Sequence, residues 1–252
     1  MLTTETPHII KRLARDQRLA GFQYYEILLN VFVVVLLVSN LVGSKIVDFG
    51  SVSLFGKTLL LRVSGAQMLF PITYIFGDIF TELYGYAGSR RAIWMGFFAS
   101  ALMAGMSAFV VWAPPAPEWP NQRAFEIVLG VVPRFVVASL VAFWAGEFTN
   151  SYVMAKMKLL TNGKHLWTRT IGSTVAGQLV DTIVVMTIAF GGRTKFSTIV
   201  SLIVSGYGAK VIYEAAATPV TYAVVNFLKR AEGVDVFDQG TNFSPFASEK
   251  NR

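Results

Sequence analysis

Two carboxylates in an otherwise apolar stretch are the residues of this chain best placed to do chemistry. The stretch FPITYIFGDIFTELYGYAGSRR, residues 70–91, carries Asp78 and Glu82 four positions apart. On a helix this spacing places both on one face, together with Pro71, Tyr74 and Gly85. A carboxylate near the centre of a bilayer costs roughly 2.5–3.5 kcal/mol. Two interpretations stay open: a functional cavity, or pairing with basic residues of neighbouring helices that only holds a bundle together.

The composition indicates a polytopic membrane protein. The 252 residues are 54% hydrophobic and 15% charged, with a mean hydropathy of +0.52, which is far from the values of a soluble domain. The chain has no cysteine, which excludes a disulfide framework and thiolate chemistry. Its net charge of +7 is typical of basic cytoplasmic loops in a membrane protein, rather than of nucleic-acid binding.

Six apolar stretches predict an all-α fold with six transmembrane helices, since about 20 residues cross a hydrocarbon core of about 30 Å. The expected spans are 24–43, 68–87, 92–112, 124–155, 168–190 and 197–228. Arg90 and Arg91 are expected to close the second span, and Pro133 to kink or start the fourth. Residues 46–66 suggest an outer hairpin or a partly re-entrant segment. The chain thus divides into an N-terminal tail (1–23), a transmembrane domain (24–230) and a C-terminal tail (231–252).

The distribution of basic residues predicts that both termini are cytoplasmic. Of the 22 Lys and Arg residues, 14 fall in the two tails and in the loops on the same side, and six fall in the other loops. Cytoplasmic loops carry the excess of Lys and Arg. Lys210 and Arg134 are left as intramembrane or near-interface bases.

Charges from four spans are expected at one depth, because a helix rises 1.5 Å per residue. They are Asp78, Glu82, Glu147, Asp181, Lys210 and Glu214. Five acids face one or two bases, so ion pairing alone cannot neutralise the set. We therefore expect a central polar cavity, slightly open towards the cytoplasmic half.

Several of these residues have structural alternatives. Lys210 and Glu214 are four positions apart and could simply pair with each other. Gln178 and Asp181 could hydrogen-bond across helices as glue. Trp144 could be an ordinary packing residue.

Asn40 and Lys45, at the far end of the first span, could cap that helix or gate the outer mouth of the cavity. No motif for a P-loop, a zinc protease or a serine nucleophile occurs in the sequence, and its two histidines, His8 and His165, lie outside the spans. We therefore expect no catalytic residues, metal site or cofactor.

Five pieces of the chain, in this order and spacing, resemble the bacterial queuosine precursor transporters, also called the VUT family. They are SNLVGSKIVDFG (39–50), FPITYIFGDIFTELYGYAGSRR (70–91), AGEFTNSYVMAKMK (145–158), RTIGSTVAGQLVDT (169–182) and KVIYEAAATP (210–219). The resemblance implies a six-helix importer of the bacterial inner membrane that forms a homodimer. It also implies that the substrates are 7-cyano-7-deazaguanine and 7-aminomethyl-7-deazaguanine.

The chemistry of such a ligand fits the polar residues. One carboxylate can accept N1–H and the 2-amino group together, with the Asp78 and Glu82 pair the first candidates, followed by Glu147 and Asp181. A second carboxylate would suit the ammonium of the aminomethyl form. The base's O6 needs a donor, from Lys210, Gln178 or Asn150, and the ring needs an aromatic face, from Tyr74 or Trp144.

Two other functions stay open at this point. One is the substrate-binding subunit of an energy-coupling-factor importer, which would need a separate ATPase. The first span, NVFVVVLLVSN, argues against it, because it lacks the small-residue docking pattern of those subunits. The other is a membrane enzyme or scaffold that uses the same polar layer.

Overall fold

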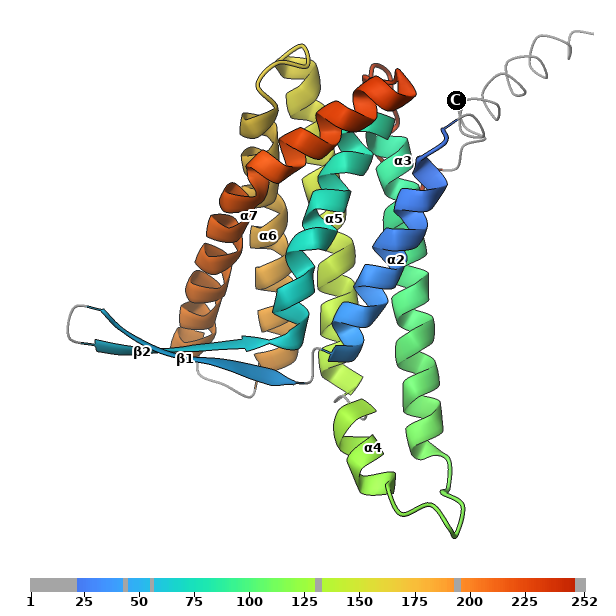
Figure 1. Cartoon of the computed structure of the whole chain (residues 1–252), viewed down its shortest axis with the longest axis vertical. Helices are drawn as coiled ribbons and strands as arrows, with labels where there is room; N and C mark the ends of the chain where they lie inside the picture. Colours follow the sequence, from blue (N-terminus) through green and yellow to red (C-terminus); the bar gives the residue numbers. More distant parts are fainter. Residues whose placement is uncertain (1–21, 43–44, 55–56, 130–132, 193–195, 248–252) are drawn as a thin grey trace, which may run out of the picture.

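The apolar runs of the sequence form long helices that lie side by side, with a β-hairpin at one end of the bundle (Figure 1). The computed structural model describes residues 22–42, 45–54, 57–129, 133–192 and 196–247. Their elements, in chain order, are α2 (Tyr25–Val42), β1 (Ile46–Leu54), β2 (Lys57–Ser64), α3 (Gly65–Trp112), α4 (Gln122–Leu129), α5 (Pro133–Leu160), α6 (Leu166–Phe190) and α7 (Phe196–Glu232).

Four helical segments of the described residues are long and apolar enough to cross a membrane. They are Tyr25–Val42, Ile72–Trp112, Leu166–Ile188 and Lys210–Glu232. The chain is therefore a multi-pass helical membrane protein. The count of six spans and the cytoplasmic position of both termini remain predictions.

The second and third expected spans are joined differently from the prediction. They form one continuous run, α3, which reverses direction at Gly85 (Figure 1). Gly85 has φ 71° and ψ 179°, a backbone conformation that favours glycine. The expected break at Arg90 and Arg91 is wrong, since both lie inside the second half of α3. The reason is a contact with a distant part of the chain, because the carboxylate of Asp238 accepts the N–H of Tyr86 at 2.9 and 3.1 Å and thereby caps the new helix start.

The fourth expected span is divided into two helices. The short helix α4 ends at Leu129, and α5 begins at Pro133. Proline suits the first turn of a helix, where its missing N–H has no intrahelical partner. Of the two alternatives for Pro133, the structure therefore shows the helix start.

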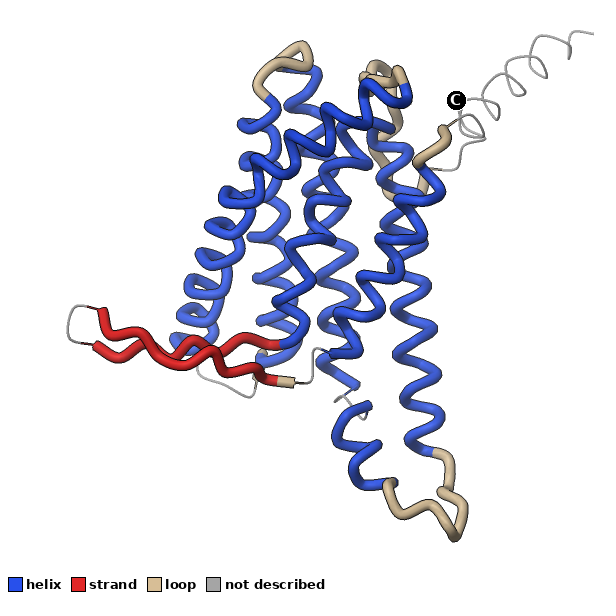
Figure 2. Tube along the Cα trace, in the orientation of Figure 1, coloured by secondary structure: helices blue, strands red, loops and turns tan. Residues whose placement is uncertain are grey.

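Residues 46–64 form an antiparallel hairpin of β1 and β2 (Figure 2). The hairpin interpretation is thus confirmed, and the all-α expectation holds for the bundle but misses this two-stranded sheet. The register shifts between Asp48 and Ser51, where Gly50 has φ 92° and donates its N–H to the Asp48 carboxylate at 2.8 Å. This is the geometry of a β-bulge.

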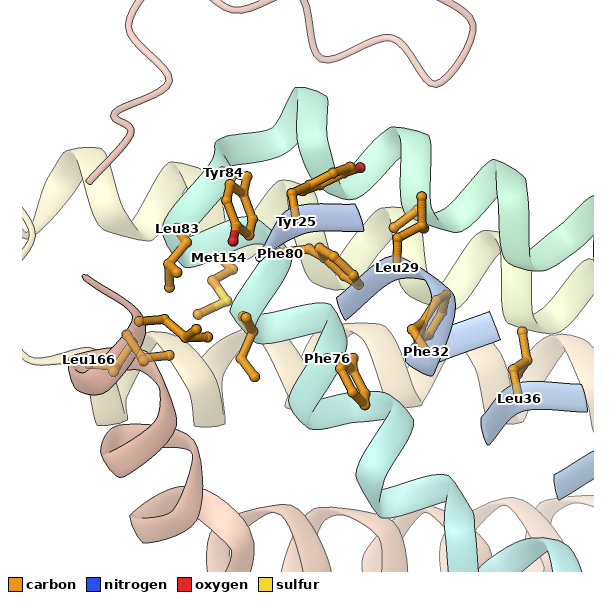
Figure 3. Close-up of a cluster of buried hydrophobic side chains, with 14 residues drawn as sticks. Tyr25, Leu29, Phe32, Leu36, Phe76, Phe80, Leu83, Tyr84, Met154 and Leu166 are labelled. Carbon is orange, nitrogen blue, oxygen red and sulfur yellow. The ribbon is translucent and has the colours of Figure 1, made fainter. Parts of the chain in front are cut away.

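Helix α2 packs on the first half of α3 through an apolar cluster (Figure 3). Leu29, Phe32 and Leu36 recur on one face of α2 and are 2–4% exposed. They meet Phe76 and Phe80 of α3, and Phe32 and Phe80 contact edge to face at 5.8 Å. In lipid, such helices associate through close van der Waals packing, because the hydrophobic effect does not drive the association of apolar surfaces there. The cluster therefore fixes the position of the α3 face that carries the acidic residues.

Candidate functional site

Three glycines bring α3, α5 and α6 into close contact around the acidic residues. A Cβ atom at Gly77 would lie 2.8 Å from Oε2 of Glu147, so a larger residue there would displace that carboxylate. A Cβ at Gly146 would lie 2.8 Å from Cβ of Asp181, and one at Gly177 would lie 2.9 Å from the Gly146 carbonyl oxygen. Small residues permit this approach of helix backbones.

The approach gathers five charged side chains, which we call the central acid layer: Asp78 of α3, Glu147 of α5, Asp181 of α6, and Lys210 and Glu214 of α7. Asp78 and Glu214 are 1% exposed and Glu147 is 7% exposed. Lys210 binds Asp181 with an N–O distance of 2.5 Å. The alternative in which Lys210 pairs with Glu214 is therefore wrong for this structure, because the ammonium points to the neighbouring helix.

Several buried acceptors of this layer have no hydrogen-bond partner among the described residues. They are Oδ2 of Asp78, Oδ1 of Asn150, Oε1 of Gln178 and both carboxylate oxygens of Glu214. The other oxygen of Asp78 accepts the amide of Asn150 at 3.3 Å. A buried polar group without a partner costs about 1–3 kcal/mol. Because these unpartnered acceptors lie on four different helices, they are suited to bind a ligand that supplies hydrogen-bond donors.

Glu82 belongs to a different group, one helical turn from Asp78. We call it the Glu82 cluster: Glu82, Lys158, Arg169, Lys229 and Asp235. Oε1 of Glu82 accepts hydrogen bonds from Arg169 at 2.6 Å and Lys229 at 2.7 Å, and Lys158 lies 3.7 Å away. Glu82 and Arg169 are both fully buried. For Glu82 the structure thus shows the pairing with neighbouring helices, and its part in ligand binding remains a prediction.

Asp235 completes this cluster from the segment after α7. It contacts Lys158 at 2.5 Å and Lys229 at 3.0 Å. Partial burial would raise the pKa of Asp235, but the hydrogen bonds and charges of the two lysines bring it below its usual value. Burial lowers the pKa of Lys158, against the opposing effect of Glu82.

Other predicted site residues take different positions. Tyr74 is partly buried and interacts with Gln178, Asp181 and Glu147, so its side chain lies beside the central acid layer. Trp144 packs in an aromatic cluster, with ring centroids 5.2 Å from Phe148 and 5.7 Å from Phe246. The surroundings of Trp144 are thus those of an ordinary packing residue, the structural alternative given for it above.

Asn40 and Lys45 lie at the hairpin end of the bundle. Asn40 is half-buried in the last turn of α2, and Lys45 is exposed just before β1. The carbonyl of Lys45 accepts the N–H of Gly65, where α3 begins. The proposed outer gate remains a prediction.

The segment after α7 contributes contacts that the sequence did not predict. Residues 231–252 were expected to be a polar tail, yet the described part, up to residue 247, packs on α3. Val236 donates its N–H to the Leu83 carbonyl at 3.2 Å, and Trp94 donates to the Pro245 carbonyl at 3.0 Å. Alternating apolar residues in this segment, such as Val236 and Phe243, were the available signal.

Arg169 is the buried site residue that sequence reasoning most clearly missed, because it was counted among basic loop residues. The signal was its spacing: Arg169, Ser173, Gly177 and Asp181 recur every four residues and so share one face of α6. Lys158 was counted with the same loop, and Lys229 was counted with the C-terminal tail at the end of the last span. Burial of these bases explains how Glu82 is neutralised.

Three acids of the central acid layer, Asp78, Glu147 and Glu214, are closed off from solvent, whereas the side chains of Asp181 and Lys210 are 21% and 31% exposed. Two surface hollows lie elsewhere, one beside Leu41 and Trp119 and one beside Arg90 and Phe246. The expected cavity open towards the cytoplasmic half therefore stays a prediction.

Comparison with known proteins gives two matches. Residues 64–224 match the family described as "Putative vitamin uptake transporter". The chain is 28% identical over 183 residues to the "Probable queuosine precursor transporter" of Bacillus subtilis (strain 168), an alignment that covers 72% of this chain and 78% of that relative. No solved structure matches the chain. The family match includes every residue of the central acid layer.

Proposed function

The chain belongs to the family described as "Putative vitamin uptake transporter", and we propose that it imports queuosine precursors across the inner membrane of a bacterium. The substrates in this proposal are 7-cyano-7-deazaguanine and 7-aminomethyl-7-deazaguanine, bound in the central acid layer. The queuosine precursor named for the Bacillus relative supports the substrate class. Both descriptions are of transporters, so the chain is a transporter and not an enzyme.

The buried acids and amide oxygens of the central region that have no basic or donor partner among the described residues are the observation that carries the proposal. A 7-deazaguanine presents N1–H and the 2-amino group side by side, which one carboxylate can accept together. Asp181 is already held by Lys210 at 2.5 Å, whereas Glu147 is buried beside Gly77 without an ion pair among the described residues. We therefore assign this edge of the base to Glu147.

The remaining groups of the base also find counterparts. Lys210 and the amides of Asn150 and Gln178 can donate to O6, and the ring of Tyr74 lies in the same layer. Trp144 is held by its aromatic neighbours, so Tyr74 is the better stacking surface. A base without the right donors would leave the buried acceptors unpaired, which is how such a site discriminates.

The proposal also includes the topology and the assembly. Six crossings result if α3 is counted on both sides of Gly85, and both termini are then cytoplasmic. Reporter fusions at each terminus test the topology. The proposed homodimer is tested by the mass of the solubilised particle.

Uptake by the purified chain in liposomes tests the proposed function. Labelled 7-cyano-7-deazaguanine should enter liposomes that contain the chain alone, and unlabelled base inside should accelerate its entry by counterflow. Empty liposomes are the control for leakage. Entry no faster than in empty liposomes would overturn the proposal, and entry only with an added ATPase module would indicate the energy-coupling-factor alternative.

A further inference from the structure

Glu214 is the most isolated charge of the central acid layer. Its side chain lies on α7 and is 1% exposed. Neither carboxylate oxygen has a hydrogen-bond partner within the described part of the chain. Lys210, one turn away on the same helix, is engaged by Asp181 of α6.

The other groups that face Glu214 are acidic or neutral. Asp78 and Tyr74 of α3 and Glu147 of α5 all interact electrostatically with it. Asp181 is compensated by Lys210. A buried carboxylate with no partner and with other acids beside it is strongly disfavoured in its ionised form. The closed state therefore needs one positive charge at Glu214.

We propose that Glu214 must carry one cation for the site to close, and that the two substrates supply it differently. This rests on the proposed function. The cyano base is neutral, so a proton stays on Glu214 both when the loaded site closes and when the empty site returns. The aminomethyl base carries an ammonium at neutral pH, which occupies Glu214 in place of the proton, and the empty site then returns with a proton taken from the cytoplasm. The cyano cycle therefore moves no net charge, whereas the aminomethyl cycle exchanges one ammonium inward for one proton outward. Carboxylates inside membranes commonly serve as such relays.

A comparison of the two bases with the unmodified chain tests this directly. The purified chain is placed in liposomes that contain a pH-sensitive dye, and either base is added outside. The aminomethyl base should make the lumen more alkaline, and a pH higher by one unit outside should raise its accumulation by up to about tenfold. The cyano base should leave the lumen pH unchanged, and its accumulation should not depend on the pH gradient.

Variants assign the effect to Glu214. Glu214→Gln should lose the alkalinisation and should lower counterflow of the aminomethyl base at least tenfold more than counterflow of the cyano base. Glu214→Asp should keep the alkalinisation by the aminomethyl base. Glu118→Gln is the matched control, because it removes a carboxylate from an exposed loop and should change nothing.

The outcomes separate this inference from the proposed function. If the unmodified chain shows no counterflow of either base, the proposed function fails and the inference with it. If counterflow occurs but the aminomethyl base leaves the lumen pH unchanged, or the cyano base changes it, only the inference is overturned. An equal loss of counterflow for both bases in Glu214→Gln would assign the residue to the base itself and would also overturn the inference. If that variant does not fold, the comparison of the two bases with the unmodified chain still decides.

Discussion

Replacing Glu82 by glutamine should destabilise the fold, because it removes the only carboxylate that contacts Arg169 among the described residues. Arg169 is fully buried, and its other acceptors are neutral: the hydroxyl of Thr161 and the carbonyl of Lys164. Lys158 would keep Asp235, and Lys229 is 22% exposed and can turn to water. One buried cation is thus left without a counter-charge. Breaking a buried pair in this way costs about 3–5 kcal/mol.

Thermal unfolding of the purified protein in detergent measures this cost. A loss of 3–5 kcal/mol corresponds to a Tm lower by about 6–20 °C for a chain of this size. The double variant Glu82→Gln with Arg169→Gln should recover a large part of the loss, since it removes the orphaned charge. Glu118→Gln, in an exposed loop, is the control and should leave Tm unchanged. A Tm of Glu82→Gln within about 2 °C of the unmodified chain would show that Glu82 does not stabilise the buried charge of Arg169.

Three further predictions follow from other contacts. Asp78→Asn leaves no buried cation without a counter-charge, so its Tm should lie within about 2 °C of that of the unmodified chain, while uptake should fall at least tenfold. Normal uptake would show that Asp78 is not in the site. Gly85→Ala should cost more than about 1 kcal/mol of stability, because its Cβ would lie 2.8 Å from Val236 and the residue has a positive φ. Gly105→Ala is the control, since a Cβ there meets open space, and it should be neutral or stabilising. Equal Tm values for the two variants would contradict this. The lowered pKa of Asp235 means that its stabilisation is present above its unfolded pKa of about 3.9 and is lost as the pH falls through the lower folded value. The Tm difference between the unmodified chain and Asp235→Asn should therefore disappear at acid pH, and a constant difference would argue against the ion pair.

The helices could be predicted from the sequence because apolar runs and their ends depend on local residues. Tyr25–Val42 and Leu166–Phe190 begin and end within two residues of the expected spans. The reversal of α3 could not be predicted in the same way, because it depends on Asp238, more than 150 residues away in the chain. Local charge, at Arg90 and Arg91, was the misleading signal.

The composition of the central acid layer could also be predicted in large part. The rise of 1.5 Å per residue predicted Asp78, Glu147, Asp181 and Glu214 at one depth, and the structure brings them together. The partners of each charge could not be predicted, since depth along a helix does not give its rotation against a neighbour. For this reason Lys210 was considered with Glu214 rather than Asp181, and the bases around Glu82 were counted with a loop and with the C-terminal tail.

The proposed transport depends on a carboxylate of the central acid layer that binds the N1–H and 2-amino edge of the base. A binding titration of the purified chain with 7-cyano-7-deazaguanine and with its analogue lacking the 2-amino group measures this contact. The analogue should bind the unmodified chain about tenfold to a hundredfold more weakly, the equivalent of one charge-assisted hydrogen bond of about 1.5–3 kcal/mol. In Glu147→Gln the affinity for 7-cyano-7-deazaguanine should fall towards that of the analogue, which should lose little more. Equal losses for both ligands would contradict the claim, because Glu147 would then not contact that edge.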